Sequence, residues 1–212
     1  MNPITAQDLQ RFSDTIAAGG VAIFPTDTLY GIACDPSDQA AADRIYELKG
    51  RPPRKPSAVM YFTVDRLLAD LPGIGAETRE LIDALLPGPY TLIIKNPEHR
   101  FPAACAGVPD KLGIRVPRLD GSPIESLAEL AFPVMQTSAN RSGEPDATGL
   151  EDIDPVIRDG VDLVLDGGPL LGVGSTVADL SELDEGRWRL LRAPIIRAGG
   201  RITELVGFPP TG

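Results

Sequence analysis

A short basic stretch stands out in an otherwise acidic chain. Residues 49–56 read Lys-Gly-Arg-Pro-Pro-Arg-Lys-Pro and place four cations within seven residues, whereas the 212-residue chain has a formal net charge of −10. A compact group of cations suits a phosphate-bearing ligand. Lys49 and Arg51 can also be explained as cations at the C-terminus of a helix, where the macrodipole favours them. That explanation does not extend to Arg54 and Lys55, which lie beyond the expected helix end.

A second stretch carries small polar side chains directly after an apolar run. Residues 137–143 read Thr-Ser-Ala-Asn-Arg-Ser-Gly and follow the apolar residues 132–135. Hydroxyl and amide groups after a strand are typical of the loops that build a ligand crevice in open α/β sheets. We therefore expect Ser138 and Asn140 to lie at a binding site with the basic stretch.

A loop near the N-terminus offers further groups. Within residues 25–31 there are hydroxyls at Thr26, Thr28 and Tyr30 and a carboxylate at Asp27. These groups suit a polar ligand, but in an ordinary turn they would satisfy local backbone groups instead. The residue types alone leave both interpretations open.

Three arginines have apolar neighbours. Arg115 lies in a strand pattern between Ile114 and Val116, so it points to the opposite face of the sheet, which is either solvated or part of a site. Arg192 and Arg197 flank an apolar run, and arginines in such places are usually paired or bind an anion.

Missing residue types exclude several kinds of chemistry. The single histidine, His99, lies in a polar run, which excludes a multi-histidine metal site and disfavours Ser-His and Cys-His catalysis. No Gly-Lys dipeptide is present, so there is no P-loop. The acidic net charge argues against a protein that coats nucleic acid. Many cations and hydroxyls with few acids favour chemistry by positioning and charge neutralisation, such as phosphoryl or nucleotidyl transfer.

Hydrophobic periodicity indicates an α/β protein. Strands are expected at residues 21–24, 57–62, 90–94, 111–116, 132–136, 161–165, 175–180 and 188–192, the last two paired through the turn-rich residues 184–186. Helices are expected within residues 5–18, 41–49, 77–86, 123–131 and 150–156. This alternation predicts a mixed parallel and antiparallel sheet flanked by helices, in one domain over residues 1–212.

The chain carries no signal for export or membrane insertion. No apolar run reaches the roughly 18 residues that a membrane span needs, and the N-terminus lacks the features of a signal peptide. Cys34 and Cys105 lie far apart, with no paired spacing. A reducing cytoplasm is therefore the expected setting, without membrane contact.

Six short motifs occur in a fixed order along the chain. They are residues 25–31 (PTDTLYG), 49–52 (KGRP), 87–91 (PGPYT), 113–117 (GIRVP), 137–143 (TSANRSG) and 174–177 (GSTV). In this order they resemble YrdC-like proteins, and the chain is similar to the threonylcarbamoyl-AMP synthases of that family from about residue 5 to residue 200. The resemblance implies a twisted α/β sheet around a large basic concavity. It also implies synthesis of threonylcarbamoyl-AMP from L-threonine, bicarbonate or CO2, and ATP, with Mg²⁺ bridging the phosphates and release of pyrophosphate.

The same resemblance implies a role for each residue that matches a family motif. Lys49 and Arg51 would be the catalytic cations. The ATP-binding set would be Lys49, Arg51, Lys55, Lys111, Ser138, Asn140 and Arg192. The threonine-binding set would be Thr28, Tyr30, Arg115 and Ser175, with Arg115 as the partner of the carboxylate. No protein ligand for the metal is identified.

The resemblance also implies partners. The product would pass to the proteins that transfer the threonylcarbamoyl group to tRNA, for the t6A modification at position 37. Direct binding of tRNA is expected to be weak or absent.

Two departures and two alternatives accompany this interpretation. Met60 stands where some relatives have a histidine, and Pro194 stands where a glycine is usual. One alternative is an RNA-binding or ribosome-maturation paralogue without synthase activity, which the acidic charge disfavours. The other is a carbamoyl-transfer domain like those of hydrogenase maturation proteins, which carry additional zinc-binding domains that this chain lacks.

Overall fold

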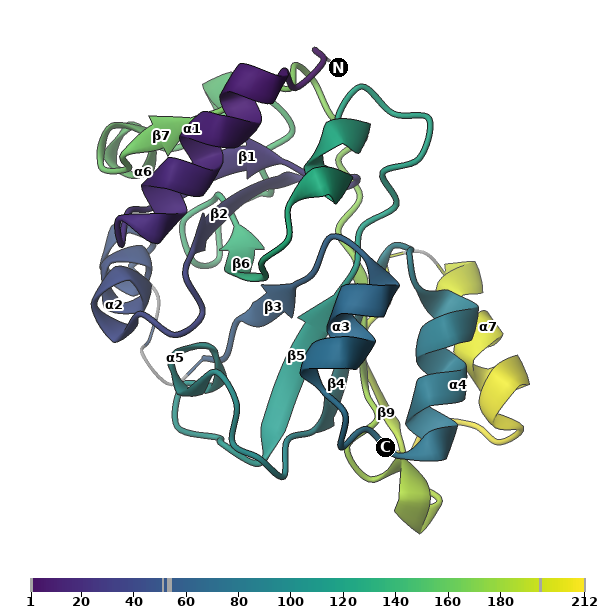
Figure 1. The fold of residues 1–212 in the computed structure, drawn as a ribbon. Coiled ribbons are helices and arrows are strands. Elements are labelled where there is room, and N and C mark those ends of the chain that lie inside the picture. The colour runs from purple at the N-terminus through teal and green to yellow at the C-terminus, as the bar shows by residue number, and fades with distance from the viewer. Residues whose placement is uncertain (1, 51, 53–54, 195, 212) are drawn as a thin grey trace.

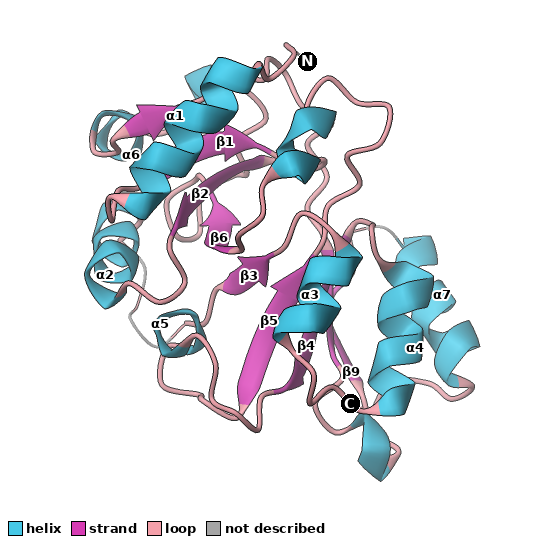
Figure 2. Cartoon of the chain, in the orientation of Figure 1, coloured by secondary structure: helices cyan, strands magenta, loops and turns pink. Residues whose placement is uncertain are grey.

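One mixed β-sheet runs through the molecule, with helices packed against it (Figures 1 and 2). The structure, a computed structural model, describes residues 2–50, 52, 55–194 and 196–211. Within these residues the sheet contains β1 (Ala22–Pro25), β2 (Tyr30–Cys34), β3 (Ala58–Met60), β4 (Tyr90–Lys95), β5 (Lys111–Arg115), β6 (Val134–Ser138), β7 (Leu163–Val164), β8 (Thr176–Asp179) and β9 (Arg189–Arg192).

The strand order is β7-β1-β2-β6-β3-β5-β4-β8-β9. The pairs β1–β7, β3–β5 and β4–β8 are parallel, and the remaining neighbours are antiparallel. The mixed sheet predicted from the sequence is therefore confirmed. The expected antiparallel pairing of the last two strands is confirmed as well.

Several of the helices begin at residues that supply side-chain caps. They are α1 (Ala6–Ala17), α2 (Gln39–Leu48), α3 (Val64–Asp70), α4 (Ala76–Leu85), α5 (Pro102–Cys105), α6 (Pro155–Asp159) and α7 (Ile196–Val206), with 3₁₀ turns η1 (Glu125–Glu129), η2 (Leu150–Asp152) and η3 (Leu183–Glu185). Thr5 and Asp8 form a capping box at the start of α1, and the Asp38 carboxylate accepts from the Ala41 amide at the start of α2.

Several elements differ from the sequence prediction. The strand β2 and the helices α3, α5 and α7 were not predicted. The helix expected at residues 123–131 is only the 3₁₀ turn η1. The helix expected at residues 150–156 is divided into η2 and α6, because Asp154 caps a new helix whose first residue is Pro155.

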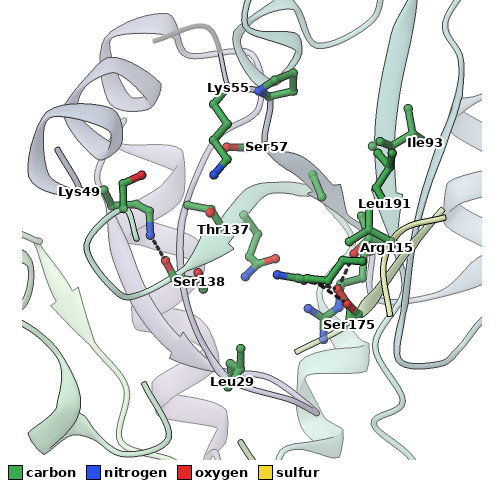
Figure 3. A pocket seen from close by; sticks show the side chains of 18 of the residues that line it. Leu29, Lys49, Lys55, Ser57, Ile93, Arg115, Thr137, Ser138, Ser175 and Leu191 are labelled. Atoms are coloured by element: carbon green, nitrogen blue, oxygen red, sulfur yellow. Dashed lines mark hydrogen bonds between the residues drawn. The ribbon is translucent and has the colours of Figure 1, made fainter. Parts of the chain in front are cut away.

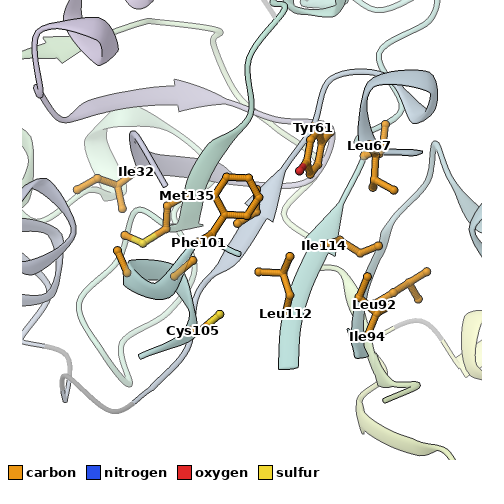
Figure 4. Packing of buried hydrophobic residues seen from close by; sticks show 14 of the residues in the cluster. Ile32, Tyr61, Leu67, Leu92, Ile94, Phe101, Cys105, Leu112, Ile114 and Met135 are labelled. Atoms are coloured by element: carbon orange, nitrogen blue, oxygen red, sulfur yellow. The ribbon is translucent and has the colours of Figure 1, made fainter. Parts of the chain in front are cut away.

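The two faces of the sheet carry separate hydrophobic clusters. The larger cluster packs helices α2 to α7 against side chains such as Leu92, Leu112 and Ile114, part of which Figure 4 shows. The smaller cluster packs α1 and η1 against Phe24, Met60 and neighbouring strand residues on the other face. Strand residues on that second face that lie beyond α1 and η1 are the ones available for a site. No helix in the described part of the chain is long and apolar enough to cross a membrane.

The larger cluster should dominate stability. Leu92 lies in β4 and is fully buried within it, so Leu92→Ala should lower the free energy of unfolding by about 2–5 kcal/mol. The exposed Val156 serves as the control, since Val156→Ala should change it by less than about 0.5 kcal/mol. Urea unfolding of both variants measures the difference, and equal losses would contradict this assignment of the core.

Candidate functional site

A cavity of about 590 Å³ opens over the face of the sheet that carries the smaller cluster. Alternation along the strands selects its lining: Lys111, Gly113 and Arg115 of β5 face the cavity, whereas Leu112 and Ile114 face the larger core. The basic side chains of the lining are Lys49, Lys55, Lys111, Arg115, Arg141 and Arg192, and its acidic side chains are Asp146 and Asp179. Among the described residues the cavity is thus strongly cationic, although the chain as a whole is acidic.

Lys49 is the C-cap residue of α2, and its side chain enters the cavity. The residue is 2% exposed, and its ammonium donates to the carbonyl oxygens of Ser138 and Asn140 (Figure 3). Lys49 therefore both ends a helix and lines the cavity. Its side chain ties the end of α2 to the segment that follows β6.

The segment after β6 is fixed by its own side chains. Ser138, the last residue of β6, donates its hydroxyl to the Asn140 side-chain oxygen at 2.5 Å. Asn140 in turn donates its amide to the carbonyl of Glu144 at 2.5 Å. The structure thus brings Lys49, Ser138 and Asn140 together at one location in the cavity lining.

Arg115 is buried on the cavity face, so the alternative of a solvated strand face is wrong. The residue is 5% exposed, and its Nη2 donates to the Asp27 carboxylate at 2.5 Å and to the Thr28 hydroxyl at 2.6 Å. Asp27 also accepts from the backbone amide of Arg118 at 3.0 Å. The Arg115 side chain thereby connects β5 to the turn between β1 and β2.

A second polar group lies around Ser175. Its hydroxyl is 2.8 Å from that of Thr91, and Arg192 donates to its carbonyl at 3.0 Å and to its hydroxyl at 3.1 Å. Ser175 and Arg115 lie on the side of the cavity opposite Lys49 and Ser138 (Figure 3). One end of the cavity is thus lined by Arg115 and Ser175. Thr28, which the sequence grouped with them, does not line the cavity but contacts Arg115.

The floor also contains ion pairs to a buried carboxylate, that of Asp179. Lys111 donates to Asp179 at 3.0 Å, and Arg189 reaches the same carboxylate at 3.3 Å. Burial acts to raise the pKa of Asp179, but hydrogen bonds from Ser181 and Lys111 outweigh it and lower the pKa. Asp179 is therefore ionised at neutral pH.

Lys55 is exposed at the rim, above Ser57.

Not every candidate residue reaches the cavity. Tyr30 is fully buried beneath it, and its hydroxyl donates to the Gly168 carbonyl at 2.9 Å and accepts from the Gly167 amide at 2.9 Å. Burial raises the pKa of Tyr30 to about 12. A hydroxyl held in this way supports the adjacent loop, and Tyr30 is not part of the cavity lining, contrary to the expectation that it contacts threonine.

Other sequence candidates lie elsewhere. Met60 packs in the smaller cluster, and Pro194 is exposed, so neither departure from the family pattern changes the cavity lining among the described residues. Arg51 and Arg54 lie outside the described residues, as does the side chain of Arg197.

Several lining residues were missed by the sequence analysis. Gln136, Thr91 and Asp179 all face the cavity, and each lies two residues from another lining residue on its own strand: Ser138, Ile93 and Val177, respectively. That two-residue spacing could have identified them once the strands were assigned. Asp27 was noted only as a loop carboxylate, and no local pattern indicates its pairing with Arg115.

The contacts of Lys49 generate a prediction about stability. Lys49→Met keeps most of the side-chain volume but removes the ammonium that two carbonyl oxygens accept from, so the free energy of unfolding should fall by about 1–3 kcal/mol. Lys95→Met, which removes an exposed surface ion pair with Asp184, is the control and should lower the free energy of unfolding much less. Chemical denaturation of both variants checks this, and an unchanged Lys49→Met would show that the ammonium contributes nothing to the fold.

Several curated proteins are similar to this chain in sequence. Threonylcarbamoyl-AMP synthase of Xanthomonas euvesicatoria pv. vesicatoria is 34% identical over 164 residues, which are 76% of this chain and 86% of that protein. The protein of the same name from Rattus norvegicus is 35% identical over 190 residues, 84% of this chain and 64% of that protein.

Solved structures of other proteins have a similar fold. P. abyssi Sua5 complexed with L-threonine has a TM-score of 0.77 and 27% identity, covering 96% of this chain and 58% of that one. E. coli YciO, at 23% identity and a TM-score of 0.74, shares the fold over 92% of this chain. A family model described as telomere recombination, Sua5/YciO/YrdC, matches residues 14–194. This chain therefore belongs to the Sua5/YciO/YrdC family.

Proposed function

We propose that this protein is a nucleotidyltransferase that makes L-threonylcarbamoyladenylate from L-threonine, bicarbonate or CO2, and ATP, with release of pyrophosphate. The observation that carries the proposal is the division of one cationic cavity into two ends. Lys49, Ser138 and Asn140 lie together at one end, and Arg115 lies with Ser175 at the other. The names of the relatives point to the same reaction.

The Lys49 end suits the phosphates of ATP. Its ammonium is already held by two carbonyl oxygens, so a phosphate oxygen would meet a cation whose position is fixed before binding. Ser138 and Asn140 offer a hydroxyl and an amide beside it. We assign Lys55, Lys111 and Arg192 to the nucleotide as well, because they border the same cavity. Arg51 keeps its proposed catalytic role on the basis of its motif alone.

The Arg115 end suits the amino acid. A guanidinium forms charge-assisted hydrogen bonds with a carboxylate, and the fixed contacts of Arg115 with Asp27 and Thr28 set its orientation. Ser175 adds a hydroxyl nearby, itself positioned by Thr91 and Arg192. In this assignment Thr28 acts by holding Arg115, and Tyr30 supports the loop from below.

The reaction then needs no covalent enzyme intermediate. The amine of threonine takes up CO2 and loses a proton, which gives a carbamate. A carbamate oxygen attacks the α-phosphorus of ATP, and the bond to the β-phosphate oxygen breaks to release pyrophosphate. Lys49 and its neighbours stabilise the charge that moves onto the phosphate oxygens as this bond breaks.

The residues present fit Mg²⁺ only as an ion held by the nucleotide. Within the described part of the chain there is no group of three histidine, cysteine, aspartate or glutamate side chains that could hold a metal. Mg²⁺ commonly binds through substrate phosphates with one or two carboxylates. Asp146, an exposed carboxylate of the lining, is the side chain that we assign beside it. Bound there, the ion would neutralise phosphate charge.

The product would be consumed by proteins that transfer the threonylcarbamoyl group to tRNA for t6A37. The acidic charge of the chain disfavours strong direct binding of tRNA, so we propose that the product leaves the cavity free or through a protein partner.

The reaction should require both small substrates at once. Pyrophosphate release from ATP should occur with threonine and bicarbonate together and should fall to background when either is omitted. Measurement of released pyrophosphate in the four combinations decides this. Pyrophosphate release at the same rate with and without threonine would rule out the proposed function. Steeply salt-dependent binding of bare tRNA, without pyrophosphate release, would favour the RNA-binding paralogue.

Arg115 should matter for threonine more than for ATP. Arg115→Lys keeps a charge beside Asp27 but loses the planar fork, so the KM for threonine should rise about tenfold to a hundredfold while the KM for ATP changes less than about twofold. Arg44→Lys, which alters a surface arginine paired with Asp162, is the matched control. Steady-state kinetics of both variants provide the test, and equal effects on the two KM values would contradict the assignment.

A further inference from the structure

The Asp27 carboxylate lies directly beside Arg115 and has a partner on each of its oxygens, and no step of the proposed reaction uses it directly. Its side chain is 10% exposed, and its two oxygens have different partners. Oδ1 accepts from Arg115 Nη2 at 2.5 Å, and Oδ2 accepts from the Arg118 backbone amide at 3.0 Å. One carboxylate thus connects the β1–β2 turn to both the side chain of Arg115 and the chain that continues from β5.

This contact leaves part of the guanidinium available. Nη2 of Arg115 makes two hydrogen bonds, one to Asp27 and one to the Thr28 hydroxyl. Nε is buried, with no hydrogen-bond partner among the described residues. Arg115 also lines the cavity. Its Nη2 is held by the β1–β2 turn, and the remaining N–H groups of the guanidinium are left to donate to a ligand.

The ion pair between Asp27 and Arg115 also changes the net charge at this end of the cavity. Asp27 and Arg115 together are neutral, so Arg115 adds donors but no net charge to this end of the cavity. Free threonine is a zwitterion with no net charge, whereas inorganic phosphate and the phosphates of a nucleotide are anions. Pairing Arg115 with Asp27 therefore weakens the electrostatic attraction for threonine only slightly. It removes most of the attraction that an unpaired buried arginine would exert on phosphate.

We propose that Asp27 is a positioning and selectivity residue, which aims Arg115 at the amino acid and cancels its charge so that phosphate groups do not occupy the amino-acid end. This inference rests on the proposed function, since it presumes that threonine binds at Arg115. The cavity must bind a triphosphate and a small amino acid side by side, and Asp27 keeps the two ends chemically distinct.

A purely structural role for Asp27 makes a different prediction. Asp162 provides the comparison, because it too joins an arginine, Arg44, at 2.6 Å to a backbone amide, that of Val21, at 2.8 Å. Asp162 lies outside the cavity lining. Asp27→Asn and Asp162→Asn should therefore both lower the melting temperature, but only Asp27→Asn should change the balance between threonine and phosphate.

The experiment measures binding and turnover on the full chain. Titration calorimetry gives the Kd of L-threonine and of inorganic phosphate for the wild type, Asp27→Asn, Asp27→Ser and Asp162→Asn. Pyrophosphate release then gives the KM for threonine and for ATP, and the inhibition constant of phosphate in competition with threonine. Asp27→Ser removes the charge with a smaller side chain, so that the test does not depend on a single variant that could fail to fold.

We expect Asp27→Asn and Asp27→Ser to weaken threonine and to strengthen competing phosphate, so that the ratio of the two affinities shifts at least tenfold towards phosphate. The KM for ATP should stay within twofold, and Asp162→Asn should leave the ratio unchanged. A constant ratio in the Asp27 variants, or an equal shift in Asp162→Asn, would overturn the inference while leaving the function intact. A wild type that neither binds threonine nor needs it for turnover would instead remove the proposed function and this inference with it.

Discussion

Each strand presents alternate side chains to opposite faces of the sheet, and this constraint separates the core of the protein from its chemistry. On β5 it places Leu112 and Ile114 in the larger hydrophobic cluster and Lys111 and Arg115 in the cavity. A shift of one residue in register would bury those cations in the core and expose the leucine and isoleucine. The packing that stabilises the sheet therefore also determines which residues reach a ligand.

The cavity keeps its cations engaged by contacts within the protein. Lys49 is held by carbonyl oxygens, Arg115 by Asp27 and Thr28, Lys111 by Asp179, and Arg192 by Ser175. Lys49 and Arg115 are buried, and buried ions are costly unless paired, so the contacts of these two cations offset part of their desolvation. They also fix the donors in place before a ligand arrives, which reduces the reorganisation required for transition-state stabilisation. The chain can consequently concentrate positive charge in one cavity although it carries ten net negative charges.

Local signals in the sequence predicted much of this arrangement. The helix that ends at Lys49, the strand that carries Arg115 and the polar segment after β6 were all expected, because periodicity and capping act over a few residues. Strand β2 was not predicted, because its five residues are all buried and give no alternating pattern. The partner of Arg115 could not be inferred either, since Asp27 is 88 residues away and meets it only through the folded sheet. Tyr30 illustrates the same limit: its motif suggested a ligand contact, whereas the fold directs its hydroxyl to the backbone of residues 167 and 168.

Under the proposed function, one cavity joins a carbamate made at the amino-acid end to the α-phosphate of ATP at the other end. The most direct measurement supplies ¹³C-bicarbonate with threonine and ATP and determines the mass of the AMP-containing product. We expect an adenylate that contains threonine and one ¹³C atom from bicarbonate. Unlabelled threonyl-adenylate, formed by attack of the amino-acid carboxylate, or AMP alone would contradict it.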